Sequence, residues 1–289
     1  MRPENLTTKI HLDGGNEAET KQVLVALGFL DGQTTNPSLI AKHPKVQQRL
    51  ARGEKLTRVE SFDFYRDVIR DIAALIPEGS VSIEVYSDEM TTTAEMLTQA
   101  DDMNRWIKNA HIKFPTTKAG LAAAHEAVRH GMRVNMTLVF SEDQGAAVYA
   151  ATAGAKRGDV LLSPFVGRLD DRGENGMDLI KNLLALYEDS DHHVEVLTAS
   201  VRSYLHFLYA LSIGSDRITA PANVLLQWAE ANTPIPTDYP YAPSLRPIHK
   251  KDLTLDKPWD SYDIYHELTT AGVDKFAADW NNLLAGEVA

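Results

Sequence analysis

Residues 111–140 read HIKFPTTKAGLAAAHEAVRHGMRVNMTLVF and contain two apolar runs with a helix-like segment between them. The runs HIKFP (111–115) and RVNMTLVF (133–140) have the length and apolar content of buried strands. The segment Lys118–His130 reads as a helix, which a preceding threonine can cap and Gly131 can close. A strand, a helix and a second strand in this order predict two parallel strands joined by a crossover helix.

The same alternation continues along the chain. The eight apolar runs are KIHLDG (9–14), FLDGQTTN (29–36), VSIEVY (81–86), HIKFP (111–115), RVNMTLVF (133–140), DVLLSPFVG (159–167), HVEVLTAS (193–200) and DRITAPA (216–222). Eight such units in about 220 residues predict an α/β protein of the (β/α)8 TIM barrel type. An open doubly wound sheet is the alternative, although the first run lacks the Gly-x-Gly-x-x-Gly turn of its dinucleotide-binding form.

We expect one domain over residues 1–289, with the barrel at about residues 8–230. A Pro-rich segment, 232–260, contains six of the 13 prolines and cannot form a regular helix, so we expect it to wrap over the surface. An additional C-terminal helix is predicted over 261–286, broken near Gly272.

Composition limits the function. The net charge of −11, from 29 basic and 40 acidic residues, argues against a nucleic-acid partner or an anionic membrane partner. The absence of cysteine excludes disulfides, a thiol nucleophile and a Cys-based zinc site. No signal segment and no long apolar run occur, which favours a cytoplasmic protein. The pair His192–His193 reads as a solvated loop and not as a metal site.

Lys113 is unexpected in a strand that otherwise reads as buried. Because side chains alternate along a strand, Lys113 faces the barrel interior if Ile112 and Phe114 face the helices. One explanation is a structural ion pair with an interior carboxylate, Glu84 or Asp13. The other is a nucleophile, because a desolvated amine loses proton affinity and then attacks a carbonyl to form a Schiff base. The residues alone leave both explanations open.

Reaction chemistry in such barrels sits at the C-terminal ends of the strands, and all eight predicted ends carry polar residues. Each has a structural alternative: Asn36 can cap a helix that begins at Pro37, and Thr137 is a good strand residue. Arg168 and Arg202 each follow a strand end. Together with a serine they could bind a phosphate at the rim. The further candidates are Thr35, Asn135, Ser163 and Ser200.

Several motifs together resemble the transaldolase family. They are DGQTTNPSLI (31–40), IKFPTTKAGL (112–121), VNMTLVFS (134–141), LLSPFVGR (161–168), TASVR (198–202) and the C-terminal GVDKFAADWNNLL (272–284). The resemblance extends over nearly the whole chain. It implies a barrel of the class I aldolase type and an enzyme of the pentose phosphate pathway.

The resemblance also implies a reaction. A dihydroxyacetone unit would pass from sedoheptulose 7-phosphate or fructose 6-phosphate to glyceraldehyde 3-phosphate or erythrose 4-phosphate. Lys113 would form the Schiff base, and Glu84 would act as acid and base through a water that Thr137 holds. Asp13 would take the proton from the donor hydroxyl during carbon–carbon cleavage. No metal and no organic cofactor is implied.

The same resemblance assigns the binding residues. Donor hydroxyls would be bound by Asn36 and Asn135, and the phosphate by Arg168, Ser200 and Arg202. The remaining pocket residues are Thr35, Ser163 and Phe165. The partners are therefore phosphorylated sugars, without nucleic acid or membrane, and a homo-oligomer is possible.

Alternatives remain within this resemblance. Fructose 6-phosphate aldolases form one branch of the family and typically carry Gln, Tyr and Lys at the positions of Glu84, Phe165 and Arg202, so these three residues favour transaldolase. Gln33 stands where a small residue is usual, and residues 234–258 match no family pattern. A lyase of the aldolase type, a transaldolase for an unusual sugar and a non-catalytic sugar-phosphate-binding barrel are the alternatives.

Overall fold

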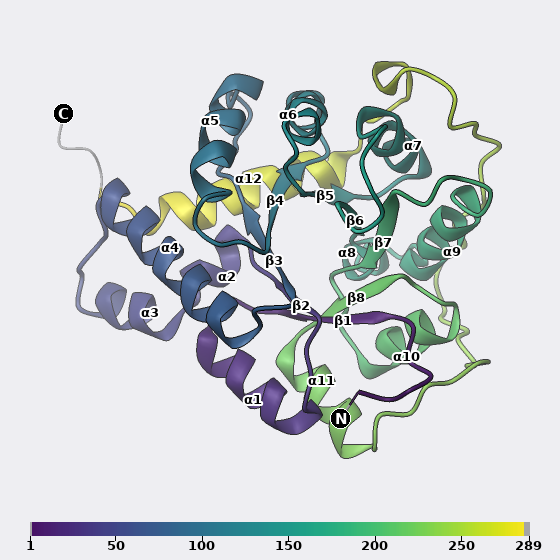
Figure 1. The fold of residues 1–289 in the computed structure, drawn as a ribbon, viewed down its shortest axis with the longest axis horizontal. Coiled ribbons are helices and arrows are strands. Elements are labelled where there is room, and N and C mark those ends of the chain that lie inside the picture. The colour runs from purple at the N-terminus through teal and green to yellow at the C-terminus, as the bar shows by residue number, and fades with distance from the viewer. Residues whose placement is uncertain (1, 286–289) are drawn as a thin grey trace.

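The computed structural model describes residues 2–285 and has a closed barrel of eight parallel strands in sequential order (Figure 1). The strands are β1 (Lys9–Asp13), β2 (Gly32–Thr34), β3 (Ser80–Glu84), β4 (Ala110–Pro115), β5 (Val134–Val139), β6 (Val160–Pro164), β7 (Val194–Thr198) and β8 (Arg217–Ala220). Each lies within one of the eight predicted runs or within a residue of it, so the predicted (β/α)8 barrel with an additional C-terminal helix is confirmed.

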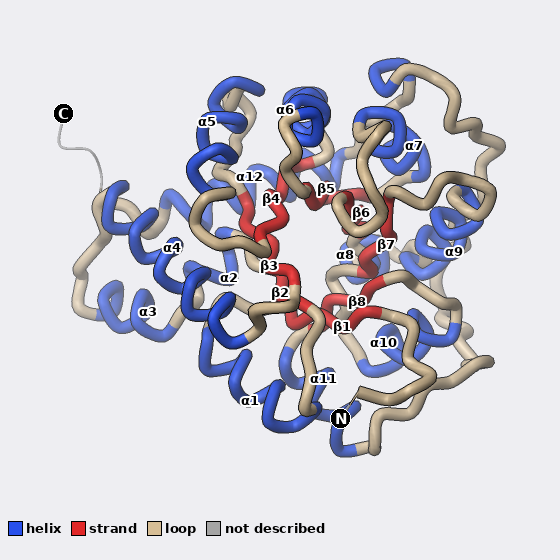
Figure 2. Tube along the Cα trace, in the orientation of Figure 1, coloured by secondary structure: helices blue, strands red, loops and turns tan. Residues whose placement is uncertain are grey.

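Helices follow every strand and surround the barrel, as the blue and red tubes of Figure 2 show. They are α1 (Glu17–Leu27), α2 (Pro37–Ala41), α3 (Pro44–Ala51), α4 (Arg58–Leu75), α5 (Thr93–Met103), α6 (Lys118–Arg129), α7 (Glu142–Ala151), α8 (Val166–Asp170), α9 (Gly176–Leu186), α10 (Tyr204–Ser212), α11 (Ala222–Glu230) and α12 (Glu267–Asn281). Most begin at a side chain that accepts a backbone N–H, and Thr57 and Thr92 form full capping boxes. Within residues 2–285, no helix has the length and apolar character to cross a membrane.

The main apolar core lies between the strands and the helices. On β4, Ile112 and Phe114 are fully buried and belong to this core. The residue between them, Lys113, contacts interior groups instead, as the alternation of a strand requires. The barrel interior is consequently polar over much of its depth: the register places Glu84 beside Lys113, and Lys113 beside Asn135.

The Pro-rich segment lies along the outside of the barrel (Figure 1). Residues 231–258, all in the described part of the chain, contain neither helix nor strand, apart from an isolated bridge at Arg246. Two contacts fix the segment against neighbouring helices: Asn182 donates to the Ile248 carbonyl, and the Lys251 amide donates to the Glu142 carboxylate. These contacts place it over α7 and α9.

The C-terminal helix differs from the prediction in two ways. It begins at Glu267 and not at 261, because the His266 side chain accepts the Leu268 amide and starts the helix there. It also continues through Gly272, which the sequence suggested as a break. A Cβ on Gly272 would lie 2.5 Å from Leu138 Cδ2, so the glycine permits close packing on β5. The predicted end at 286 lies outside the described residues.

His193 also differs from the prediction. Its side chain is 2% exposed, so it is not part of a solvated loop. The ring lies 4.5 Å from the ring of Tyr149, and its nitrogens contact Asp191 and Thr152. Burial of the apolar ring body, with both nitrogens satisfied, explains this position.

Candidate active site

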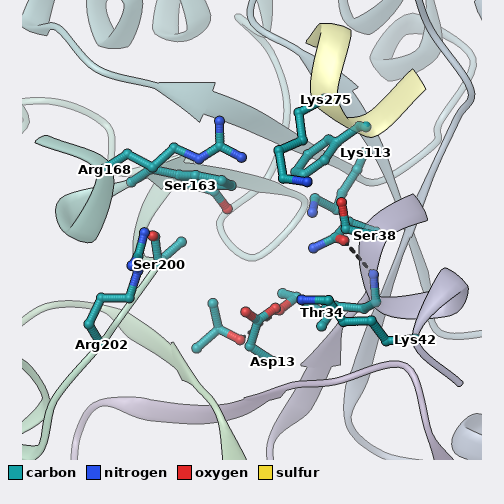
Figure 3. A pocket seen from close by; sticks show the side chains of 16 residues that line it. Asp13, Thr34, Ser38, Lys42, Lys113, Ser163, Arg168, Ser200, Arg202 and Lys275 are labelled. Atoms are coloured by element: carbon teal, nitrogen blue, oxygen red, sulfur yellow. Dashed lines mark hydrogen bonds between the residues drawn. The ribbon is translucent and has the colours of Figure 1, made fainter. Parts of the chain in front are cut away.

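A cavity of about 230 Å³ opens at the C-terminal ends of the strands (Figure 3). Eight of the twelve predicted site residues line it, namely Asp13, Asn36, Lys113, Ser163, Phe165, Arg168, Ser200 and Arg202. The other four, Glu84, Thr35, Asn135 and Thr137, are buried beneath or beside it. The residues predicted from the C-terminal ends of the strands therefore lie close together in the folded chain.

Lys113 lies at the centre of this cluster. Its Nζ is 2.9 Å from Glu84 Oε2 and donates to the Thr35 carbonyl at 3.0 Å. The Lys113 and Glu84 side chains are 4% and 2% exposed. The ion pair that the sequence suggested as a structural explanation is thus present, but the lysine also faces a cavity. The two explanations for Lys113 are compatible.

Two carboxyl groups near Lys113 have raised pKa values. Burial raises the pKa of Glu84, and the neighbouring Lys113 opposes that shift without cancelling it. Burial likewise raises the pKa of Asp13, against the opposing effects of Lys113 and of the hydrogen bond from Thr34 Oγ1 at 2.9 Å. Carboxyl groups with raised pKa values exchange protons with a ligand more readily near neutral pH.

A polar layer lies under the cavity floor. Asn135 donates to Ser82 Oγ at 3.0 Å and accepts from Ser163 Oγ at 2.7 Å, so it supports Ser163 from below. Thr137 Oγ1 is buried and has no hydrogen-bond partner among residues 2–285. Such an atom is available to a water or a ligand.

Two predicted residues of β2 and its loop have structural partners. Thr35 Oγ1 donates to the Ser82 carbonyl and contacts Tyr65 Oη, both at 2.8 Å, so its side chain turns away from the cavity. Asn36 caps α2 by accepting the Leu39 amide at 2.9 Å. Asn36 also lines the cavity, so the helix cap suggested by the sequence does not exclude a second role.

The predicted arginines lie together on one side of the cavity, next to Ser200 (Figure 3). Arg168 stacks over the rings of Phe165 and Phe276, at 5.8 and 5.6 Å from their centroids. Burial, and secondarily the charge of Arg202, lower the pKa of Arg168. Arg202 forms an exposed ion pair with Asp171 at 2.9 Å.

Gly167 permits this arrangement. A Cβ there would lie 2.4 Å from the Ser200 carbonyl oxygen and 2.5 Å from Arg202 Cγ. The Gly167 amide donates to that same carbonyl at 3.1 Å. Ser200 itself has a φ of 57°, a left-handed conformation that residues with side chains seldom adopt. The SPFVGR and TASVR motifs therefore meet in a close backbone contact.

Several lining residues are absent from the predicted set. Thr34 and Thr219 end strands, and the strand-end rule could have selected them. Ser38 lies in α2 and Lys42 is the C-cap of that helix, whereas Lys275 and Phe276 lie in α12. No local signal distinguishes Lys42 or Lys275 from other surface lysines, because only the packing of α2 and α12 turns them toward the cavity.

Comparisons with known proteins agree with the motifs. Residues 10–287 match the family profile described as "Transaldolase/Fructose-6-phosphate aldolase". A "Probable transaldolase" of Dehalococcoides mccartyi is 33% identical over 275 residues, which cover 95% of this chain and 99% of the relative. Similar proteins of the same name occur in Geobacter sulfurreducens (33%; 92% and 96% covered) and Methanococcus maripaludis (34%; 94% and 97% covered).

Proposed function

The chain belongs to the transaldolase/fructose-6-phosphate aldolase family, and from this premise we propose that it is a transaldolase that acts through a Schiff base on Lys113. It transfers a dihydroxyacetone unit from a ketose phosphate to an aldose phosphate. One observation carries the proposal: a buried lysine amine lines a cavity and lies 2.9 Å from a carboxyl group of raised pKa.

Schiff-base formation needs a neutral amine. Glu84 is close enough to take a proton from the Lys113 ammonium, after which Nζ attacks the carbonyl carbon of the ketose. The carbinolamine then loses its hydroxyl as water when Glu84 returns the proton, directly or through a water held at Thr137 Oγ1. That hydroxyl is buried without a partner among the described residues, which supports its role in holding a water.

Carbon–carbon cleavage follows on the iminium ion. Asp13 takes the proton of the donor hydroxyl, the C3–C4 bond breaks, and the electron pair moves into the iminium to give an enamine. The aldose phosphate leaves with the new carbonyl. An acceptor aldehyde then adds to the enamine while Asp13 returns the proton, and hydrolysis of the new imine releases the product ketose. The raised pKa of Asp13 suits both directions of this transfer.

The charge of the cavity supports a phosphorylated substrate. The chain as a whole carries a net charge of −11, yet the cavity lining contains five cations and one carboxylate. The cations are Lys42, Lys113, Arg168, Arg202 and Lys275. We assign Arg168, Ser200 and Arg202 to the phosphate, because an arginine guanidinium offers paired N–H donors to a phosphate. Asn36 and Ser163 remain for sugar hydroxyls.

Borohydride trapping tests the proposal directly. Incubation with fructose 6-phosphate and borohydride should add the mass of the reduced adduct to Lys113, and Lys113→Ala should abolish the addition. Unmodified wild-type protein under the same conditions would exclude Schiff-base chemistry with this donor. Omission of the acceptor aldehyde distinguishes a transaldolase from an aldolase. A transaldolase stalls at the enamine, whereas steady release of dihydroxyacetone would identify an aldolase.

A further inference from the structure

The C-terminal helix α12 reaches the cavity from a part of the chain far from the other site residues. Lys275 and Phe276 line the cavity, and Figure 3 shows Lys275 descending from this helix, drawn in yellow. The same helix packs against α2 and β5. Its contacts with β5 fall on the residues that follow the proposed water-holding Thr137.

β5 is irregular at this point. Its pairing with β6 shifts register between Met136 and Val139. Leu138, within this bulge, has a φ of 60°, which is unfavourable for a leucine because its Cβ crowds the backbone. Bulges next to active sites redirect the side chains beside them. Thr137 directly precedes Leu138 in this bulge.

Side chains from two helices hold the bulge. Thr269 Oγ1 donates to the Leu138 carbonyl at 2.9 Å, and Gln144 Nε2 donates to Thr269 Oγ1 at 2.8 Å. Gln144 Oε1 also accepts the Phe140 amide at 2.7 Å. The carbonyl of Leu138 and the amide of Phe140 are therefore satisfied by one continuous network. Thr269 and Gln144 are both buried, so a broken bond would not be replaced readily by bulk water.

The next turns of α12 contact the side of the cavity that carries Arg168. A Cβ on Gly272 would lie 2.5 and 2.9 Å from the two Leu138 methyl carbons and 3.2 Å from Arg168 Nη1. Phe276, one turn further, lies under the Arg168 guanidinium. Residues spaced by three and four lie on one helix face, so Thr269, Gly272 and Phe276 form a single contact surface.

We infer that Thr269, Gly272 and Gln144 are positioning residues of this active site: they hold the Leu138 bulge, which orients Thr137 Oγ1, and they seat Arg168. The inference rests on the proposed function for the roles of Thr137 and Arg168. The role of these residues in holding the bulge rests on the contacts described above, and hydrogen–deuterium exchange tests it separately.

The experiment compares Thr269→Val, Thr269→Ser and Thr270→Val. Valine keeps the shape of threonine but removes the hydroxyl that donates to the Leu138 carbonyl, whereas serine keeps that hydroxyl. Thr270 is exposed on the same helix, so Thr270→Val is the matched control. We expect Thr269→Val to lower kcat about tenfold with little change in KM, because a small misplacement of a catalytic group is costly. Thr269→Ser should stay within about twofold of wild type, as should Thr270→Val.

Gly272→Ala tests the other end of the surface. Its methyl group would meet Leu138 at 2.5 Å and Arg168 at 3.2 Å, so kcat should fall about tenfold as in Thr269→Val, and KM for fructose 6-phosphate should also rise. Hydrogen–deuterium exchange supplies the structural readout. Peptides covering residues 136–141 should exchange at least about threefold faster in Thr269→Val than in Thr270→Val.

Three outcomes overturn the inference: equal exchange in Thr269→Val and Thr270→Val, equal kcat in these two variants, or no rescue by Thr269→Ser. A wild-type protein without Schiff-base activity would instead refute the proposed function. In that case the exchange comparison alone decides whether α12 holds the bulge.

Discussion

Two buried ion pairs lie inside the same barrel, one toward each end, and they differ in the chemistry of their cations. At the C-terminal end, Lys113 pairs with Glu84. At the N-terminal end, Arg217 donates through two nitrogens to Glu195, and both of these side chains are almost fully buried. The cation of each pair lines a cavity, of about 230 Å³ for Lys113 and about 420 Å³ for Arg217, so the presence of a cavity does not separate the two pairs.

The two ion pairs differ in the charged groups that surround them. Lys113 lies among two carboxyl groups, Glu84 and Asp13, whose pKa values are both raised by burial. Glu195 lies among three cations, because Lys9 Nζ and Arg157 Nε approach it at 3.6 Å in addition to Arg217. Carboxyl groups of raised pKa beside an amine can exchange protons with it, whereas three cations around the Glu195 carboxylate form a cluster of ion pairs.

The cations themselves add to this difference. A lysine can lose its proton and become a nucleophile, but an arginine stays protonated at every pH at which proteins fold. A buried ion pair is therefore weak evidence for catalysis by itself. The pair at the C-terminal end fits chemistry because its cation is a lysine, whose amine can act as a nucleophile, and the pair at the other end fits a structural role because its cation is an arginine.

The largest expected effect is that of Lys113→Met. It should lower turnover by about 10³-fold or more, because the other lysines of the cavity lining, Lys42 and Lys275, are exposed and do not pair with Glu84 as Lys113 does. The fold should survive, since the buried Glu84 can take a proton once its partner is removed. Steady-state kinetics and thermal unfolding of the same preparation check both parts. Turnover above a few per cent of wild type would place the nucleophile elsewhere.

Arg217→Met should show the reverse pattern. Removal of one member of a buried pair should lower the free energy of unfolding by about 3 kcal/mol, moderated by the two remaining cations near Glu195. The kcat of the folded fraction should stay near that of wild type. Urea denaturation measures the first quantity, with Arg133→Met, which borders the same cavity, as the control. A large loss of kcat without loss of stability would contradict the structural role of this end.

The two ends should also respond oppositely to pH. Burial lowers the pKa of His111 to about 3, so the folded protein keeps this ring neutral. The unfolded chain binds a proton below its ordinary pKa of about 6.5, so the stabilisation is complete above pH 6.5 and is lost as the pH falls toward the folded value. Between pH 6.5 and 5.5 this amounts to about 1 kcal/mol.

The raised pKa values of Asp13 and Glu84 work in the other direction, since the folded protein then binds the extra protons and gains stability as the pH falls. Measuring stability against pH for wild type and for His111→Gln isolates the histidine, because both proteins share the carboxyl groups. Parallel curves for the two proteins would show that His111 does not contribute.

The smallest expected effect concerns Lys275, an exposed cation at the cavity mouth that pairs with Asp279 at 3.1 Å. Lys275→Gln should raise KM for a phosphorylated donor about threefold at low salt, with a smaller change at 0.5 M salt, because exposed charges are screened. Lys45→Gln, also exposed but outside the cavity, is the control. Equal KM values for the two variants would limit anion binding to the arginine side.

Strand and helix positions could be predicted because they depend on local patterns. The apolar runs and the helix caps between them act over a few residues, and the alternation of side chains placed Lys113 inside the barrel before any tertiary contact was known. The depth of a side chain along the barrel depends instead on strand register. Asn135, for example, hydrogen-bonds Ser163 and is not among the residues that line the cavity, and its predicted contact with donor hydroxyls stays a prediction.

The sequence by itself determined the order of the elements, the inward side of the strand that carries Lys113 and, through its motifs, the family. Only the tertiary structure decided that Lys113 pairs with Glu84, that Gly272 continues a helix, and that α12 contacts the Leu138 bulge. The physical reason is the distance along the chain over which the relevant interactions act. Backbone preferences and side-chain alternation are set by near neighbours, whereas the distance from Thr269 to Leu138 exists only after the barrel closes and the last helix packs on it.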